Sequence, residues 1–107
     1  MADTLSRLAG PSQVASGTST IFTVPSAHIY TVKYITIMNQ AGTPTAVEMG
    51  INGVANSNLI FPTTQFNPSG GTAYFECTFI FTATDTLQIN VSQGSAITVS
   101  VHGIDQG

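Results

Sequence analysis

The two histidines are the residues of this chain best suited to proton transfer or metal binding. His28 lies in a predicted turn that follows Pro25, and His102 is expected to point outward from the last predicted strand. A metal site needs three or four converging ligands, and the His, Cys, Asp and Glu residues here show no ligand spacing. We therefore interpret both histidines as exposed surface residues, and we predict no metal ion and no cofactor.

Cys77 is the single cysteine and the candidate nucleophile. It shares the predicted inward face of one strand with Phe75, Phe79 and Phe81. A thiol in apolar surroundings stays protonated and unreactive, so this pattern favours core packing over catalysis. One cysteine also excludes an internal disulfide.

Glu48 and Glu76 are the only glutamates, and two carboxylates could act together as acid and base. Both are predicted on outward faces of strands, where carboxylates are commonly solvated or pair with a cation such as Lys33. No third polar group or cleft accompanies them. The sequon Asn90-Val91-Ser92 has no chemical meaning without a secretory signal, and Gly70-Gly71 lacks the lysine of a phosphate-binding loop. The sequence thus predicts a protein that is not an enzyme.

Charge is the most unusual feature of the composition. Only 7% of the residues are Asp, Glu, Lys or Arg, against about 25% in ordinary soluble domains. The two basic residues are Arg7 and Lys33, and the formal net charge is -3. Nucleic-acid binding requires a basic patch, so we predict no nucleic-acid partner. The polar surface must come from hydroxyls and amides, including 16 threonines and 10 serines, which suits contact with neighbouring proteins.

Membrane insertion and export are not indicated. The apolar runs are far shorter than the ~20 residues that span a bilayer. Residues 1–5 lack the basic-then-apolar layout of a signal peptide, so we expect synthesis in the cytoplasm and no membrane partner.

Strand-forming residues dominate the chain, and turn signals recur at short intervals. The predicted strands cover 19–24, 29–39, 46–51, about 59–61, 73–81, 86–92 and the segment from 97 onward, with 4–8 as a further candidate. Residues 1–107 are therefore expected to form one all-β domain, an antiparallel β-sandwich of seven or eight strands of the Greek-key or jelly-roll type. The strand order stays open at this stage.

Two strand patterns carry more detailed predictions. In 29–39 the apolar positions change parity, so either both faces are covered or a bulge near Tyr34 switches the register. The last three strands alternate cleanly and are joined by connections of hairpin length, which favours an antiparallel meander. Asn52-Gly53 predicts a tight turn, because both residues tolerate positive φ.

Candidate contact residues lie in two parts of the chain. Phe61 and Phe66 fall in the irregular segment 54–72 beside prolines, where they either cap the core or form an apolar patch for a neighbouring subunit. Residues 1–14 form either the first strand or an N-terminal arm that reaches onto a partner. The candidate protein-interface residues are Leu5, Arg7, Leu8, Phe61 and Phe66.

Several segments resemble small virion proteins of tailed bacteriophages, in which an aromatic-Thr-Val-Pro strand precedes a Val-Lys-x-Ile-x-Ile-x-Asn strand. The matching segments are Ile21-Phe22-Thr23-Val24-Pro25, Tyr30 to Asn39, Gly50-Ile51-Asn52-Gly53, Asp85 to Ile89 and Val99 to Ile104. The resemblance spans about residues 5 to 104. Such proteins serve as capsid decoration, head-fibre or minor tail proteins, and no functional residues can be transferred position by position.

The resemblance implies a structural role in the virion. We expect a capsid decoration protein, made in the host cytoplasm, that binds the major capsid protein on the outer head shell as a homotrimer. The alternatives are a minor tail or baseplate component, which would contact tail proteins, and a carbohydrate-binding adhesion module. Sugar sites favour exposed Trp and Tyr, and this chain has no Trp and three Tyr.

Overall fold

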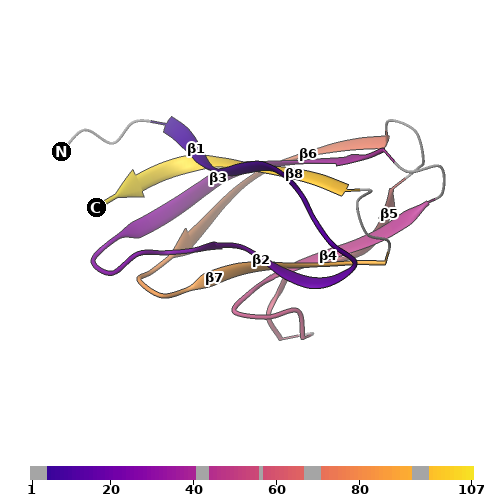
Figure 1. Ribbon diagram of the computed structural model, residues 1–107. Helices are drawn as coiled ribbons and strands as arrows, with labels where there is room; N and C mark the ends of the chain where they lie inside the picture. Colours follow the sequence, from indigo (N-terminus) through magenta and orange to yellow (C-terminus); the bar gives the residue numbers. More distant parts are fainter. Residues whose placement is uncertain (1–4, 41–43, 56, 67–70, 93–96) are drawn as a thin grey trace.

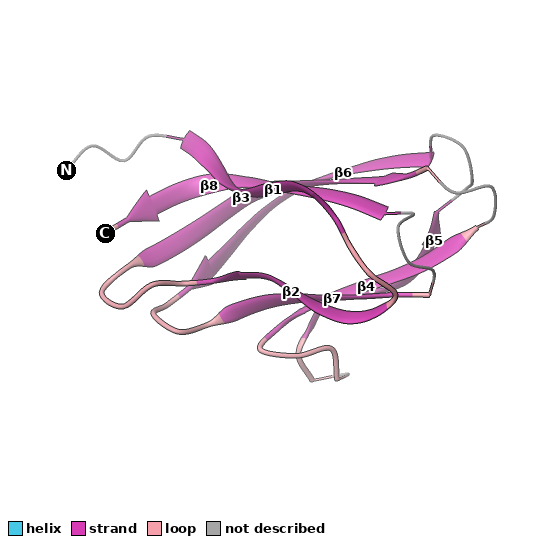
Figure 2. Ribbon diagram, viewed as in Figure 1, coloured by secondary structure: helices cyan, strands magenta, loops and turns pink. Residues whose placement is uncertain are grey.

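The computed structural model describes residues 5–40, 44–55, 57–66, 71–92 and 97–107, except for the side chains of 61–66, 71, 73 and 77. These residues form strands connected by turns and contain no helix (Figure 2). The strands are β1 (Leu5–Gln13), β2 (Gly17–Thr23), β3 (Ile29–Asn39), β4 (Thr45–Ile51), β5 (Leu59–Phe66), β6 (Gly71–Phe81), β7 (Thr86–Val91) and β8 (Ile97–Gln106).

The strands form two four-stranded sheets that pack face to face (Figure 1). The order is β1-β8-β3-β6 in one sheet, called here the β1 sheet, and β2-β7-β4-β5 in the other, the β2 sheet. Every pairing is antiparallel. Each strand lies in the opposite sheet from the strand before it, except that β4 and β5 are neighbours in one sheet. This is the topology of an eight-stranded jelly roll. The predicted all-β sandwich is confirmed.

The predicted C-terminal meander is wrong. β7 lies in the β2 sheet, whereas β6 and β8 lie in the β1 sheet with β3 between them. Each of these strands buries one face against the core, so its alternating pattern is the same in a meander and in a jelly roll. The short turn 82–85 joins strands of different sheets instead of closing a hairpin.

The core between the sheets is mainly aliphatic. The Phe22 ring packs edge-on against Phe81, with 5.0 Å between centroids, and against Tyr30 at 5.1 Å. Burial of each such side chain contributes about 1.5–3 kcal/mol. The buried apolar residues are Val14, Phe22, Val24, Val32, Ile35, Ile37, Val47, Met49, Phe81, Leu87, Ile89, Val91, Ile97, Val99 and Val101. The side chain of Cys77 lies outside the described ones, so its predicted core position stays a prediction.

A bulge at Lys33 explains the parity change in β3. The register shifts between Val32 and Tyr34 against both neighbouring strands. Val32, Ile35 and Ile37 therefore all face the core, while Tyr34 turns to the outer side of the sheet. Of the two alternatives that the sequence left open for 29–39, the structure shows the bulge near Tyr34.

Two strands run further than the sequence predicts. β1 continues beyond residue 8 through Gly10-Pro11, with register shifts on either side of Ala9. Gly10 has φ +78°, and an added Cβ would collide with the Val99 carbonyl oxygen, so glycine is required there. β5 includes Pro62, which the sheet tolerates because β5 is an edge strand with a register shift at that point.

Candidate interaction face

The described residues contain no group of three or more His, Cys, Asp or Glu side chains placed to hold a metal ion. No pocket opens on the described surface either. Glu48 lies on the β2 sheet and Glu76 on the β1 sheet, both facing outward, so the sandwich separates them. In the described ranges no helix is long and apolar enough to cross a bilayer.

His28 has a partner that its sequence position does not reveal. Its Nδ1 lies 2.7 Å from the Asp105 carboxylate, and each side chain is about one-third exposed, at 33% and 38%. The contact joins the β2–β3 turn to the end of β8. Because the two groups are 77 positions apart in the chain, no local pattern could indicate it.

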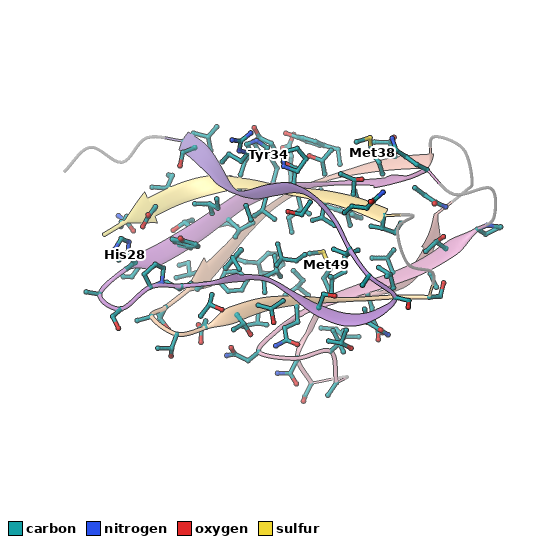
Figure 3. The ribbon with its side chains drawn as sticks, in the orientation of Figure 1. His28, Tyr34, Met38 and Met49 are labelled. Atoms are coloured by element: carbon teal, nitrogen blue, oxygen red, sulfur yellow. The ribbon has the colours of Figure 1, made fainter. Side chains whose placement is uncertain are left out.

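The outer surface of the β1 sheet contains aromatic and basic side chains that point away from the core. We call this surface the tyrosine face. Its residues are Leu5, Arg7, Lys33, Tyr34, Tyr74, Glu76, Ile80 and His102. Figure 3 shows Tyr34 on this outer side and Met49 between the sheets. Both basic residues of the sequence, Arg7 and Lys33, belong to this face.

One row of side chains crosses the whole tyrosine face. Arg7 on β1 is opposite His102 on β8, which is opposite Tyr34 on β3. Tyr34 is in turn opposite Glu76 on β6. The row therefore begins with a cation at one sheet edge and ends with a carboxylate at the other.

Aromatic stacking holds the middle of this row. The His102 ring stacks on Tyr34 with 4.6 Å between centroids and 14° between planes. Tyr74 lies beside Tyr34 at 5.2 Å and is 55% exposed. Desolvation first, then the negative charge of Glu76, raises the pKa of Tyr74 above its ordinary value of 10.0. Nδ1 of His102 is buried and has no hydrogen-bond partner among the described residues.

A second row on the same face is apolar at both ends. Leu5 on β1 is opposite Ile104, which is opposite Thr31, and Thr31 is opposite Ile80 on β6. Leu5 is 54% and Ile80 62% exposed. Between the two rows, the Lys33 ammonium donates a hydrogen bond to the Thr78 hydroxyl at 3.2 Å, which draws it toward β6.

The outer face of the β2 sheet has a different character. Its cross-strand neighbours are hydroxyls and amides, such as Thr18 opposite Asn90 and Thr20 opposite Gln88. The Asn90 amide donates a hydrogen bond to the Glu48 carboxylate at 3.1 Å. Among the side chains that the structure describes, the tyrosine face is the outer face that combines exposed aromatic and aliphatic groups with cations.

The residues predicted as interface from the sequence do not form one cluster. Leu5 and Arg7 lie on the tyrosine face at the β1 edge, whereas Leu8 turns inward and packs against the core, because the register shifts between Arg7 and Ala9. Phe61 and Phe66 belong to β5, at an edge of the other sheet, and their side chains lie outside the described ones.

Sequence reasoning did not identify the remaining residues of the face as contact candidates. The alternation in 73–81 correctly placed Tyr74, Glu76 and Ile80 on the outward side of their strand. Their alignment with Arg7 and Leu5 depends on the order β1-β8-β3-β6, which the pattern does not contain.

No family model matches this sequence, and no curated protein matches it. Among solved structures, a chain of the virus-like particle of extra small virus from the giant freshwater prawn Macrobrachium rosenbergii matches with a TM-score of 0.52 and 13% identity. The match covers 98% of this chain and 78% of that one. At this identity the likeness shows a shared fold.

Two further structures match with TM-scores of 0.37, too low to carry an argument. They are an exo-beta-1,3-galactanase from Phanerochaete chrysosporium with galactose (14% identity) and infectious bursal disease virus (10% identity). Each match covers 97% of this chain but only 26% and 29% of the other chains, so this chain spans under a third of their length.

Proposed function

We propose that this protein is a structural component of a virus particle, and that it is a decoration protein on the outer head shell of a tailed bacteriophage. The jelly-roll topology carries the proposal, because viral capsid domains commonly use this fold and the prawn-virus particle chain shares it. Sparse charge, a surface rich in hydroxyls and an exposed aromatic face support it.

The proposed mechanism is stabilisation by binding. A protein that binds the assembled shell, and not its separated subunits, shifts the equilibrium toward the assembled state. Many symmetric copies add their contacts, so each contact can be modest. The partner is then the major capsid protein, and a described surface without a pocket is suited to a protein partner.

Purified protein added to undecorated heads tests the proposal. We expect saturable binding and a higher temperature of head disruption, and we expect the protein in virions at a copy number proportional to that of the major capsid protein. Absence of binding at saturating concentration would refute decoration. A few copies per virion by quantitative mass spectrometry would indicate the tail or baseplate instead.

A carbohydrate-binding module is the second candidate, because one observation favours it. Tyr74 is 55% exposed and lies next to Tyr34, so the two rings offer a surface on which a sugar could stack. A glycan array distinguishes the candidates: binding that is lost in Tyr74→Ala, with heads left unbound, would favour the carbohydrate function.

A further inference from the structure

We infer that the tyrosine face pairs with the tyrosine face of a second copy of this chain, about a two-fold axis that lies between the faces and runs along the strands. Arg7 of each copy then lies opposite Glu76 of the other. This pairing concerns contacts between copies, and it does not depend on the proposed role on a head shell.

Arg7 and Glu76 cannot neutralise each other within one chain. They stand at opposite edges of a four-stranded sheet, three strand spacings or about 14 Å apart. Among the described residues neither forms an ion pair. Within the described part of the chain, each charge therefore faces outward without an ion-pair partner.

The two-fold rotation matches both rows. A rotation about an axis parallel to the strands exchanges the sheet edges and keeps each row at its own height, so β1 of one copy lies over β6 of the other. Arg7 then meets Glu76, and the exposed Leu5 meets the exposed Ile80. Each of these contacts occurs twice, as an isologous interface requires. In the centre, His102 of one copy lies over Tyr34 of the other.

Tyr74 also lies opposite a complementary part of the other copy. It is opposite Thr36, which is opposite Ser100. At this height β1 carries Gly10 and Pro11, between the pairs that Ala9 and Ser12 form with β8. The protruding ring of one copy thus lies over the lowest side chains of the β1 edge of the other.

Charge favours this axis over the other two-fold axis that could lie between the faces, which runs perpendicular to the strands. An axis perpendicular to the strands would place β1 over β1 and β6 over β6. β1 contains Arg7 and no carboxylate, and β6 contains Glu76 and no Lys or Arg, so like charges would face each other. Lys33 is held toward β6 by Thr78, which separates the two ammonium groups across the axis.

The area of the face indicates which class of interface the pair would form. Four strands at about 4.8 Å spacing and about nine residues at 3.3 Å give roughly 600 Å² per copy. Two faces bury roughly 1,200 Å², the lower limit for specific interfaces. We therefore expect a reversible, concentration-dependent dimer instead of an obligate dimer.

Sedimentation equilibrium of the full chain and of charge variants tests the pairing. We expect a concentration-dependent dimer for the natural sequence and at least a tenfold higher Kd for Arg7→Glu and for Glu76→Arg. The double variant, Arg7→Glu with Glu76→Arg, restores the opposite charges and should regain the dimer. Glu48→Arg is the matched control for Glu76→Arg, because it makes the same charge change on the β2 sheet. It should leave the Kd of the dimer unchanged.

Three outcomes would overturn the inference. They are a monomer at millimolar concentration, the homotrimer expected from the sequence, and a folded double variant that stays monomeric. If the double variant does not fold, Ile80→Ser decides: Ile80 is 62% exposed, so its loss should leave the fold intact. An unchanged Kd in Ile80→Ser would contradict the pairing. Head binding is measured separately, so failure of one proposal does not imply failure of the other.

Discussion

Asp85 connects the β6–β7 turn to Asn52, at the end of the sandwich where the C-terminus lies (Figure 1). Its carboxylate accepts hydrogen bonds from the Thr82 N–H at 2.9 Å, the Thr82 hydroxyl at 3.1 Å and the Asn52 amide at 2.9 Å. The side-chain amide oxygen of Asn52 accepts a hydrogen bond from the Thr86 N–H at 2.8 Å. Asn52 and Thr84 have positive φ, at 59° and 70°. The carboxylate thus fixes turns that hold strained backbone.

The cost of removing this carboxylate follows from its three hydrogen bonds. Hydrogen bonds to a charged group contribute about 1.5–3 kcal/mol each when well buried. These bonds are near the surface, where water can replace them, and bonds that share one acceptor are not additive. We expect Asp85→Ala to lower the free energy of unfolding by about 2 kcal/mol at neutral pH, which corresponds to about 10 °C in Tm.

The effect has a defined pH dependence. The hydrogen bond from Asn52, followed by those from Thr82, lowers the pKa of Asp85 below 3.8. A group whose folded pKa is lowered stabilises the protein above its unfolded pKa, and this contribution disappears as the pH falls through the folded pKa. Asp85→Asn should therefore be less stable than the natural protein at pH 7, and the difference should shrink as the pH falls below 3.8 and through the lowered pKa of Asp85.

Urea denaturation from pH 7 to pH 2 measures this difference directly. Thr82→Val is a control that removes one donor and keeps the carboxylate, so it should cost less than Asp85→Asn and retain the pH dependence. A difference between the natural protein and Asp85→Asn that is equally large at pH 2.5 and pH 7 would show that the ionised carboxylate is not the source of the stability.

Two further substitutions test the packing of β8. His102→Phe keeps a ring on Tyr34 and removes the buried Nδ1 that lacks a hydrogen bond among the described residues, so we expect a gain of about 1 kcal/mol in urea denaturation, and a loss of that size would contradict it. Gly103→Ala would push a Cβ against the Thr31 carbonyl oxygen and the Leu8 side chain, so we expect a loss of about 3 kcal/mol. Ser100→Ala, on the outer face of the same strand, should change stability by less than about 0.5 kcal/mol.

Strand existence was predictable because each strand of a sandwich has one buried face. The alternation in Leu87, Ile89 and Val91 follows directly from this, and so does the parity change that indicates the Lys33 bulge. Strand order was not predictable, because the choice between pairing with a sequence neighbour and crossing to the other sheet depends on contacts such as β8 with β1 and β3, far apart in the chain.

Strand ends were predicted poorly where proline intervened. Pro11 and Pro62 indicated loops, yet both lie within strands. β1 and β5 are edge strands, where one side of the backbone needs no ladder partner, and register shifts absorb the missing N–H. Whether a strand is an edge is itself a property of the sheet order, so the same missing information limits both predictions.

The residues of the tyrosine face also come together only through the strand order, so the sequence did not indicate this face. The same face determines how the pairing of copies and the binding to a head shell can be tested separately. If copies pair through the tyrosine face, that face is covered, and a head shell must contact the hydroxyl- and amide-rich β2 sheet or the turns at the ends of the sandwich. Arg7→Glu should then weaken pairing at least tenfold while each monomer keeps its affinity for heads. If the tyrosine face instead contacts the shell, Arg7→Glu weakens head binding, and the double variant with Glu76→Arg does not restore it, because the shell carries no compensating change.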